Sequence, residues 1–147
     1  MTHCLIKKET SNLIITHQAP SVDEFLLLRE KIGWANPAHE VAQLSLDNSL
    51  FHVCIRKNAQ LLGYGRVVGD GAMYFYIQDI MVNPDFQQQG IGAQIMNQIE
   101  SFLENTAQSG ATIGLFAACG KEAFYEKFGY CSRTGVPLGL GMCKFIK

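Results

Sequence analysis

The chain has 147 residues, 48% of them hydrophobic, and a formal net charge of −1 from 12 basic and 13 acidic residues. This is the size of one ordinary domain with enough apolar residues for a core, so we predict a single domain over residues 1–147. The near-neutral charge gives no broad positive field, which argues against a nucleic acid or a membrane surface as partner. Any bound anion must be held by local groups.

Five cysteines are present, an odd number with no C-x-x-C pair. This pattern favours a reduced, intracellular protein over a disulfide framework. The four histidines are scattered without metal-ligand spacing, so no metal site is predicted. No stretch approaches the roughly 20 apolar residues of a membrane span, and the polar opening does not resemble a secretory signal. These features predict a cytoplasmic location.

In chain order, residues 3–9 and 13–19 have the composition of two short strands around a polar turn. Ser21 followed by Glu24 is a capping-box pattern that predicts a helix over 21–34. A second short helix is predicted from Pro37 through residue 46. Apolar segments 49–57 and 61–70 then flank the polar turn 58–60, which indicates a hairpin, and 72–82 is the next strand.

After the stretch QQQGIG at 87–92, apolar residues at helical spacing predict a helix that ends before Gly110. Residues 111–118 follow as a buried strand and 121–129 as a short helix, with 130–133 and 141–147 as closing strands. The strand, helix and strand over 72–118 imply a parallel pair joined by a right-handed crossover. The predicted fold is therefore α/β (α+β), with a mixed, mostly antiparallel sheet and helices on both faces.

The joint QQQGIG has the properties of an anion site. The first N–H groups of a helix have no partner within the helix, and the positive end of the helix dipole lies there. Gly90 and Gly92 carry no side chain that would keep a phosphate from the backbone. The phosphate-binding motif G-x-x-x-x-G-K-[ST] is absent from the sequence. The motif G-x-G-x-x-G does not fit either, because Ile95 stands at its third glycine position. A tight turn with glycines that only permit close packing is the alternative.

Two segments resemble the GCN5-related N-acetyltransferase (GNAT) superfamily. Residues 82–92 fit V-x-P followed by Q-x-x-G-x-G, which is similar to the family's acetyl-CoA signature, and 124–130 fit F-Y-x-x-x-G-[FY]. The resemblance implies a GNAT-like sheet splayed between its fourth and fifth strands, with acetyl-CoA as co-substrate. The cofactor's diphosphate would lie on Gln87, Gln88, Gln89, Gly90, Ile91, Gly92 and Ala93.

The same resemblance implies that the pantetheine arm pairs along Ile80, Met81 and Val82, with a main-chain N–H near Met81 or Val82 facing the thioester oxygen. Tyr125 matches the family position whose hydroxyl reaches the coenzyme A sulfur. Asp79 is the candidate general base, with an orienting or structural role as its alternative.

Arg29 and Trp34 end the first predicted helix, where the family often builds its acceptor pocket, and are the candidate substrate residues. A core position for Trp34 and a solvent-exposed one for Arg29 are the alternatives. Ala118 stands where the family often has an asparagine, which puts one cofactor contact in doubt. Cys119 beside it raises an acyl-cysteine route, but no histidine is visibly paired with it, so direct transfer is preferred.

The implied function is transfer of an acetyl group to a primary amine, with a small molecule as the favoured acceptor. Acetylation of a protein N-terminus or lysine, and coenzyme A binding without catalysis, are the alternatives. Paired subunits are common in the family, so a homodimer is one assembly that the resemblance implies.

Overall fold

The computed structural model describes residues 12–147. Its contacts divide it into two compact units, the first ending at Leu115 and the second comprising Phe116–Lys147. The strand predicted over residues 3–9 lies outside the described residues. Each unit is described by itself below.

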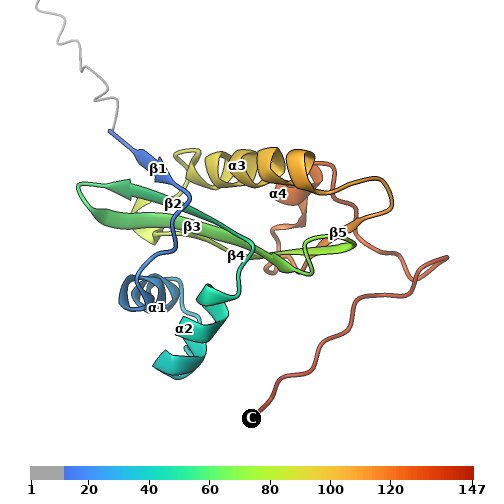
Figure 1. The fold of residues 1–147 in the computed structure, drawn as a ribbon, viewed down its shortest axis with the longest axis horizontal. Helices are drawn as coiled ribbons and strands as arrows, with labels where there is room; N and C mark the ends of the chain where they lie inside the picture. The colour runs from blue at the N-terminus through green and yellow to red at the C-terminus, as the bar shows by residue number, and fades with distance from the viewer. Residues whose placement is uncertain (1–11) are drawn as a thin grey trace, which may run out of the picture. The chain divides into compact units, whose positions relative to one another are not determined.

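A five-stranded sheet forms the centre of the first unit (Figure 1). The strands lie in chain order, with antiparallel pairs from the first to the fourth and a parallel pair between the last two. The mixed, mostly antiparallel sheet predicted from the sequence is thus confirmed. The strands are β1 (Ile14–Thr16), β2 (Phe51–Lys57), β3 (Gln60–Gly69), β4 (Tyr74–Val82) and β5 (Thr112–Leu115).

Two helices cover one face of this sheet: α1 (Val22–Lys31) and α2 (His39–Asp47). The capping box that begins α1 is present, because the Ser21 hydroxyl accepts from Glu24 N–H and the Glu24 carboxylate accepts from Ser21 N–H. A core cluster joins the two helices to the sheet below them. Its buried members are Val22, Phe25, Leu28, Ala42, Leu46, Cys54, Leu61, Tyr64 and Met81.

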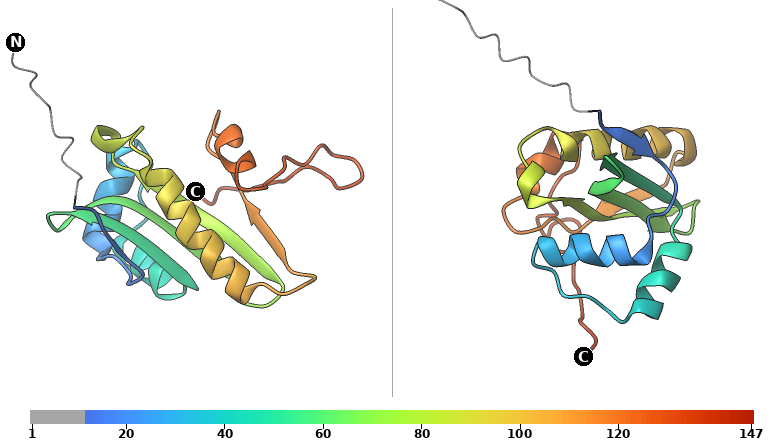
Figure 2. Two further views of the ribbon diagram at one scale, coloured as in Figure 1. Left: turned by 90° about the horizontal axis from the view of Figure 1, so that it is seen from above. Right: turned by 90° about the vertical axis from the view of Figure 1, so that its left-hand side faces the viewer.

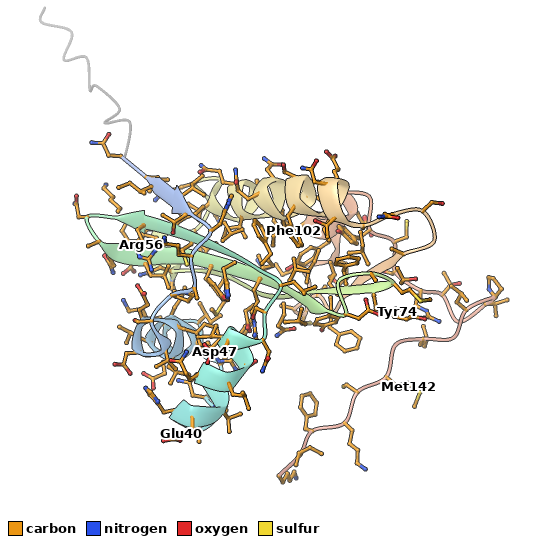
Figure 3. All side chains as sticks on the ribbon, in the orientation of Figure 1. Glu40, Asp47, Arg56, Tyr74, Phe102 and Met142 are labelled. Carbon is orange, nitrogen blue, oxygen red and sulfur yellow. The ribbon has the colours of Figure 1, made fainter. Side chains whose placement is uncertain are left out.

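The opposite face is covered by α3 (Ile91–Thr106), as the two views in Figure 2 show. Glycines on β3 let this helix lie close to the sheet. A Cβ atom at Gly65 would lie 2.5 Å from Ile95 Cγ2 and 2.7 Å from Ile80 Cδ1, and one at Gly63 would lie 2.7 Å from Ile91 Cγ2. Further along α3, Phe102 stacks on Phe51 of β2 with ring centroids 4.4 Å apart. Figure 3 labels Phe102 among the side chains.

The second unit contains one short helix, α4 (Glu122–Glu126). The closing strands predicted over 130–133 and 141–147 are wrong for this structure, since neither segment has strand structure. A strand forms only where a neighbour takes up its main-chain N–H and C=O groups. The apolar side chains that gave the strand pattern are exposed instead, as at Met142, Phe145 and Ile146.

No helix within residues 12–147 is both long enough and apolar enough to cross a lipid bilayer.

A Gly65→Ala substitution tests the close docking of α3. The added methyl group would overlap two isoleucine side chains, so we expect a loss of about 1–3 kcal/mol in the free energy of unfolding. Gly114→Ala on β5 is the matched control, because a Cβ atom there has nothing within 4 Å. Urea unfolding of both variants measures the difference, and equal stabilities would contradict this account of the docking.

A histidine and a tyrosine form a polar pair at the edge of the α1 and α2 face. His52 Nδ1 lies 2.6 Å from the Tyr64 hydroxyl, which is completely buried. Burial lowers the pKa of His52, and the positive charge of Arg66 lowers it further. Burial also raises the pKa of the Tyr64 hydroxyl, so the tyrosine remains the donor and the neutral imidazole the acceptor.

This pair predicts a pH dependence of stability. The unfolded chain, in which an imidazole titrates near pH 6.5, takes up the proton more readily than the folded chain does. The free energy of unfolding should therefore fall as pH drops through about 6.5, and continue to fall until His52 is protonated in the folded state. His52→Gln should flatten that slope in urea titrations at a series of pH values. A slope identical to that of the unchanged protein would refute the assignment.

Candidate active site

The outer edge of β4 is free over its last five residues. Parallel pairing with β5 runs from Tyr74↔Thr112 to Ile77↔Leu115, and β5 ends there, whereas β4 continues to Val82. Among the strands of the described part of the chain, none lies beside residues 78–82 on that edge. The end of this pairing corresponds to the splay predicted between the fourth and fifth strands.

The register of β4 on β3 determines which main-chain groups this edge presents. Asn83 N–H donates to Leu62 C=O at 2.7 Å, and Met81 is opposite Tyr64. Because hydrogen-bonding direction alternates along a strand, Met81 and Asn83 face β3 while Ile80 and Val82 face outward. The Val82 carbonyl accepts from the Gln87 side-chain amide at 3.2 Å. Of the two N–H groups expected from the sequence, the geometry favours that of Val82.

The connection from β4 to α3 is a tight turn with two residues in the left-handed conformation. After a 3-10 turn at Pro84–Phe86, Gln88 and Gly90 have positive φ angles of 61° and 80°. Gly90 is the N-cap of α3, and no side chain of the described residues caps that helix. A Cβ atom at Gly90 would meet nothing within 4 Å, so glycine is needed there for its left-handed conformation and for the open surface it leaves.

This connection has the properties of an anion cradle. The first turn of the 16-residue helix α3 begins at Ile91 and includes no acidic side chain, and the residues from Gln87 to Gly90 are exposed. The first intrahelical bond is donated by Gln94 N–H to Gly90 C=O, which leaves the N–H groups of Ile91, Gly92 and Ala93 without a partner in the helix. Those N–H groups, with the positive end of the helix dipole, suit a phosphate group.

A β-bulge interrupts β4 beside the free edge. Tyr64 is opposite Met81 and Arg66 is opposite Gln78, so Gly65 alone faces both Asp79 and Ile80. Asp79 has φ of 57°, a left-handed conformation that costs a residue other than glycine about 1–3 kcal/mol. A conformation of this cost persists only where surrounding contacts hold it.

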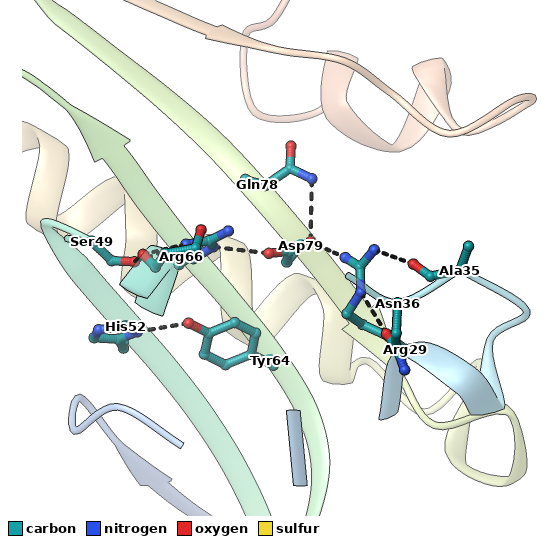
Figure 4. Close-up of polar contacts among 10 residues, drawn as sticks. Arg29, Ala35, Asn36, Ser49, His52, Tyr64, Arg66, Gln78 and Asp79 are labelled. Carbon is teal, nitrogen blue, oxygen red and sulfur yellow. Dashed lines mark hydrogen bonds and ion pairs between the residues drawn. The ribbon is translucent and has the colours of Figure 1, made fainter. Parts of the chain in front are cut away.

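Two arginines hold Asp79 in place (Figure 4). Arg66 Nε lies 2.8 Å from Asp79 Oδ2, and Arg29 Nη1 lies 3.0 Å from Asp79 Oδ1. The Gln78 amide adds a third donor at 3.2 Å. The carboxylate is buried, with 1% of its side chain exposed. Both oxygens of the candidate base therefore already accept hydrogen bonds, and solvent does not reach them.

The candidate substrate residues belong to the same network. Arg29 also donates from Nε to the Asn36 side chain and from Nη2 to the Ala35 carbonyl. Its guanidinium carbon lies 5.3 Å from the ring centroid of Trp34, and Trp34 packs, partly buried, against the core cluster. Arg29 is thus an ion-pair residue rather than a solvent-exposed one, and each of its three guanidinium nitrogens donates to a group of the protein itself.

Arg66 is the residue of this network that sequence reasoning missed. It donates to Asp79, the Ser45 carbonyl and the Ser49 hydroxyl. The signal was available: Arg66 and Asp79 carry opposite charges inside two neighbouring apolar strand patterns. Such residues are buried only when they are paired.

The second unit contains the other catalytic candidate. Tyr125 lies on α4 and is 9% exposed, with its ring packed edge-on against Phe124 at 5.0 Å. Cys119 is exposed and precedes this helix, and Ala118 C=O accepts from Lys121 N–H. Tyr125 and Asp79 lie in different units.

Residues 12–147 contain no group of three or more histidine, cysteine, aspartate or glutamate side chains that could hold a metal ion. Cys54 is buried in the core, where burial raises the pKa of its thiol to about 11. It is therefore a protonated core residue at neutral pH.

Comparison with known proteins gives a consistent result. The family model of the acetyltransferase (GNAT) domain matches residues 30–137. The uncharacterized N-acetyltransferase ycf52 of Porphyra purpurea is 31% identical over 107 residues, which are 70% of this chain and 60% of that protein. The chain thus spans about 60% of the length of this curated relative and of the one from Pyropia yezoensis.

Solved structures share the fold. A protein of unknown function from meticillin-resistant Staphylococcus aureus is 32% identical and superposes with a TM-score of 0.83 over 92% of this chain and 98% of that one. A GNAT family acetyltransferase from Brucella melitensis, solved in complex with acetyl-CoA, has a TM-score of 0.62 at 17% identity, covering 83% of this chain and 84% of that one.

Proposed function

Because the chain belongs to the GNAT acetyltransferase superfamily, we propose that it moves an acetyl group from acetyl-CoA to a primary amine of a small molecule, by direct attack in a ternary complex. One observation carries this proposal: the first turn of α3, which no side chain of the described residues caps and whose N-cap is Gly90, comes shortly after the free outer edge of β4 along the chain. The first feature suits a diphosphate and the second an extended amide-bearing arm.

The proposed cofactor site follows from those two features. The diphosphate is bound by main-chain N–H groups of residues 87–93, whose side chains carry no positive charge. The pantetheine arm pairs with the outward groups of Ile80 and Val82, as an added strand does at an open sheet edge. A B. melitensis protein with the same fold was solved with acetyl-CoA bound, which supports acetyl-CoA as the ligand.

The chemistry needs no nucleophilic side chain. The neutral amine attacks the thioester carbon, a C–N bond forms, and the C–S bond breaks with its electron pair on sulfur. An outward N–H such as that of Val82 would stabilise the negative charge that develops on the carbonyl oxygen. Tyr125 is the proposed hydrogen-bond and proton donor to the departing thiolate. Since ordinary pKa values are near 10 for tyrosine and 8.5 for a thiol, full transfer would be uphill by roughly 2 kcal/mol.

The proton released by the attacking amine needs an acceptor. Asp79 as this base stays a prediction, and the engagement of both its oxygens by guanidinium donors weighs against it. Trp34 stays the candidate for contact with the acceptor, on the side of the sheet that α1 covers. The net charge of −1 gives no sign of a strongly charged acceptor.

Gly90→Glu tests the proposed function at the cofactor site. The new side chain places bulk and negative charge in the cradle, so acetyl-CoA binding should be lost in isothermal titration calorimetry, and thiol release with a panel of small amines should fall to background. Gly110→Glu is the matched control, because Gly110 is also left-handed, with φ of 96° and nothing within 4 Å of a Cβ atom. Normal affinity in Gly90→Glu, or absence of thiol release by the unchanged protein with every amine, would refute the proposal.

Tyr125→Phe tests the proposed proton donor. Removing the hydroxyl should lower kcat by about 10–100-fold, within the usual range for general acid catalysis, while the dissociation constant for acetyl-CoA stays nearly the same. Tyr74→Phe, at an exposed tyrosine on β4, serves as control. An unaltered kcat in Tyr125→Phe would remove Tyr125 from the mechanism.

A further inference from the structure

Asp79 lies on β4, where three other segments of the chain contact this strand. Through Arg29 its carboxylate is joined to α1 and to Ala35 and Asn36 of the connection that follows α1. Through Arg66 it is joined to the C-terminal end of α2, at Ser45 and Ser49. We call Arg29, Asp79 and Arg66 the bulge clamp (Figure 4).

The bulge changes which face of the sheet the end of β4 presents. Before the bulge, Ile77 is opposite Val67. Val67 is separated from Gly65 and Gly63 by an even number of positions, so all three lie on the face of β3 that α3 covers. After it, Met81 is opposite Tyr64 and belongs to the core cluster under α1 and α2. Without the extra residue, the odd-numbered positions would stay on the α3 face, and the outward N–H groups would shift by one.

The bulge also coincides with the start of the free edge. The last residue of β4 that pairs with β5 is Ile77, and the left-handed residue is Asp79, two positions later. The main-chain groups directed outward beyond this point are those of Ile80 and Val82. Their direction therefore depends on whether Asp79 keeps its conformation.

We propose that Asp79 is a positioning residue, held by Arg29 and Arg66, that sets the outward direction of the Ile80 and Val82 N–H groups toward the thioester arm. This inference rests on the proposed function, because it needs an acyl carrier on the β4 edge. It assigns the clamp a larger role in kcat than in cofactor affinity, since the diphosphate cradle lies beyond Val82 and does not include these three residues.

The charges of the clamp fit positioning better than proton transfer. A general base needs a free lone pair within reach of its proton. Asp79 accepts from two guanidinium groups and one amide, and 1% of its side chain is exposed. A planar guanidinium holds a carboxylate in a fixed orientation, which suits a residue that must keep an unfavourable φ angle.

Asp79→Asn isolates the charge of the clamp. Asparagine accepts a left-handed conformation as readily as aspartate does, so only the ion pairs change. We expect kcat for thiol release to fall by about 10–100-fold, as a displacement of about 1 Å in a reacting group can cost 100-fold. The KM for acetyl-CoA should change by a smaller factor than kcat, since the pairing with the pantetheine arm weakens but the diphosphate cradle is intact. Both limbs of the pH–rate profile should be retained.

Arg29→Gln supplies the second variant if Asp79→Asn folds poorly. The clamp predicts a kcat defect in Arg29→Gln that is no larger than the one in Asp79→Asn, because Arg66 still holds Asp79. The double variant should lose no more than Asp79→Asn alone, because that change has already removed the Arg29–Asp79 ion pair. Arg56→Gln is the control: it breaks an arginine–carboxylate pair of 2.8 Å with Glu24, outside β4, and should leave kcat unchanged.

Hydrogen exchange of the β4 amides separates this inference from the proposed function. In Asp79→Asn, the Met81 and Asn83 amides, which face β3, should exchange at least about 10-fold faster than in Arg56→Gln, because local opening of β4 becomes easier. Loss of the acidic limb of the pH–rate profile in Asp79→Asn alone would overturn positioning and make Asp79 the base. Unchanged exchange would overturn the clamp even in an active enzyme. If the unchanged protein binds acetyl-CoA but transfers nothing, the proposed function is refuted. The clamp then has no catalytic role, even where hydrogen exchange shows that it holds β4.

Discussion

The close docking of α3 on the glycines of β3 is the constraint on which the rest of the site depends. At Gly63 and Gly65 the sheet has no side chains, and the isoleucines of α3 fill that space. This packing sets the position of the helix relative to the strands beneath it. The uncapped N-terminus of α3 therefore lies at a fixed place after the end of β4. An anion cradle needs such rigidity, because its N–H groups gain from a phosphate only when they are already oriented.

A second constraint acts from the other face of the sheet. There the α1 and α2 helices reach the same strand through Arg29 and Arg66, which share the buried carboxylate of Asp79. The two constraints meet on β4: one sets where the cradle lies, and the other sets which way the strand edge faces. Through these two arginines, α1 and α2 are connected to the strand that carries the proposed chemistry.

Local sequence signals predicted much of this fold. The capping box at Ser21 and Glu24 is a contact within one helical turn, and the aromatic and branched residues of 72–82 identified β4. The signature around Gly90 is equally local. The closing strands failed because apolar residues in 141–147 are compatible with a strand but do not show whether a sheet edge is available to pair with it. The bulge at Asp79 was invisible for a related reason: positions 75, 77, 79 and 81 alternate as buried residues straight across it, and only the pairing with β3 reveals the extra residue. For Arg66 the sequence did offer a signal, an opposite charge in the neighbouring strand pattern, but only the pairing of β3 with β4 shows that its partner is the carboxylate 13 positions away.

The central claim is that main-chain N–H groups at the start of α3 bind the diphosphate of acetyl-CoA. A crystal structure of the protein with coenzyme A tests it most directly. The account predicts diphosphate oxygens within about 3.2 Å of N–H groups between Gln87 and Ala93, with the pantetheine arm beside Ile80 and Val82. A diphosphate held elsewhere, or an arm that leaves the β4 edge bare, would contradict it.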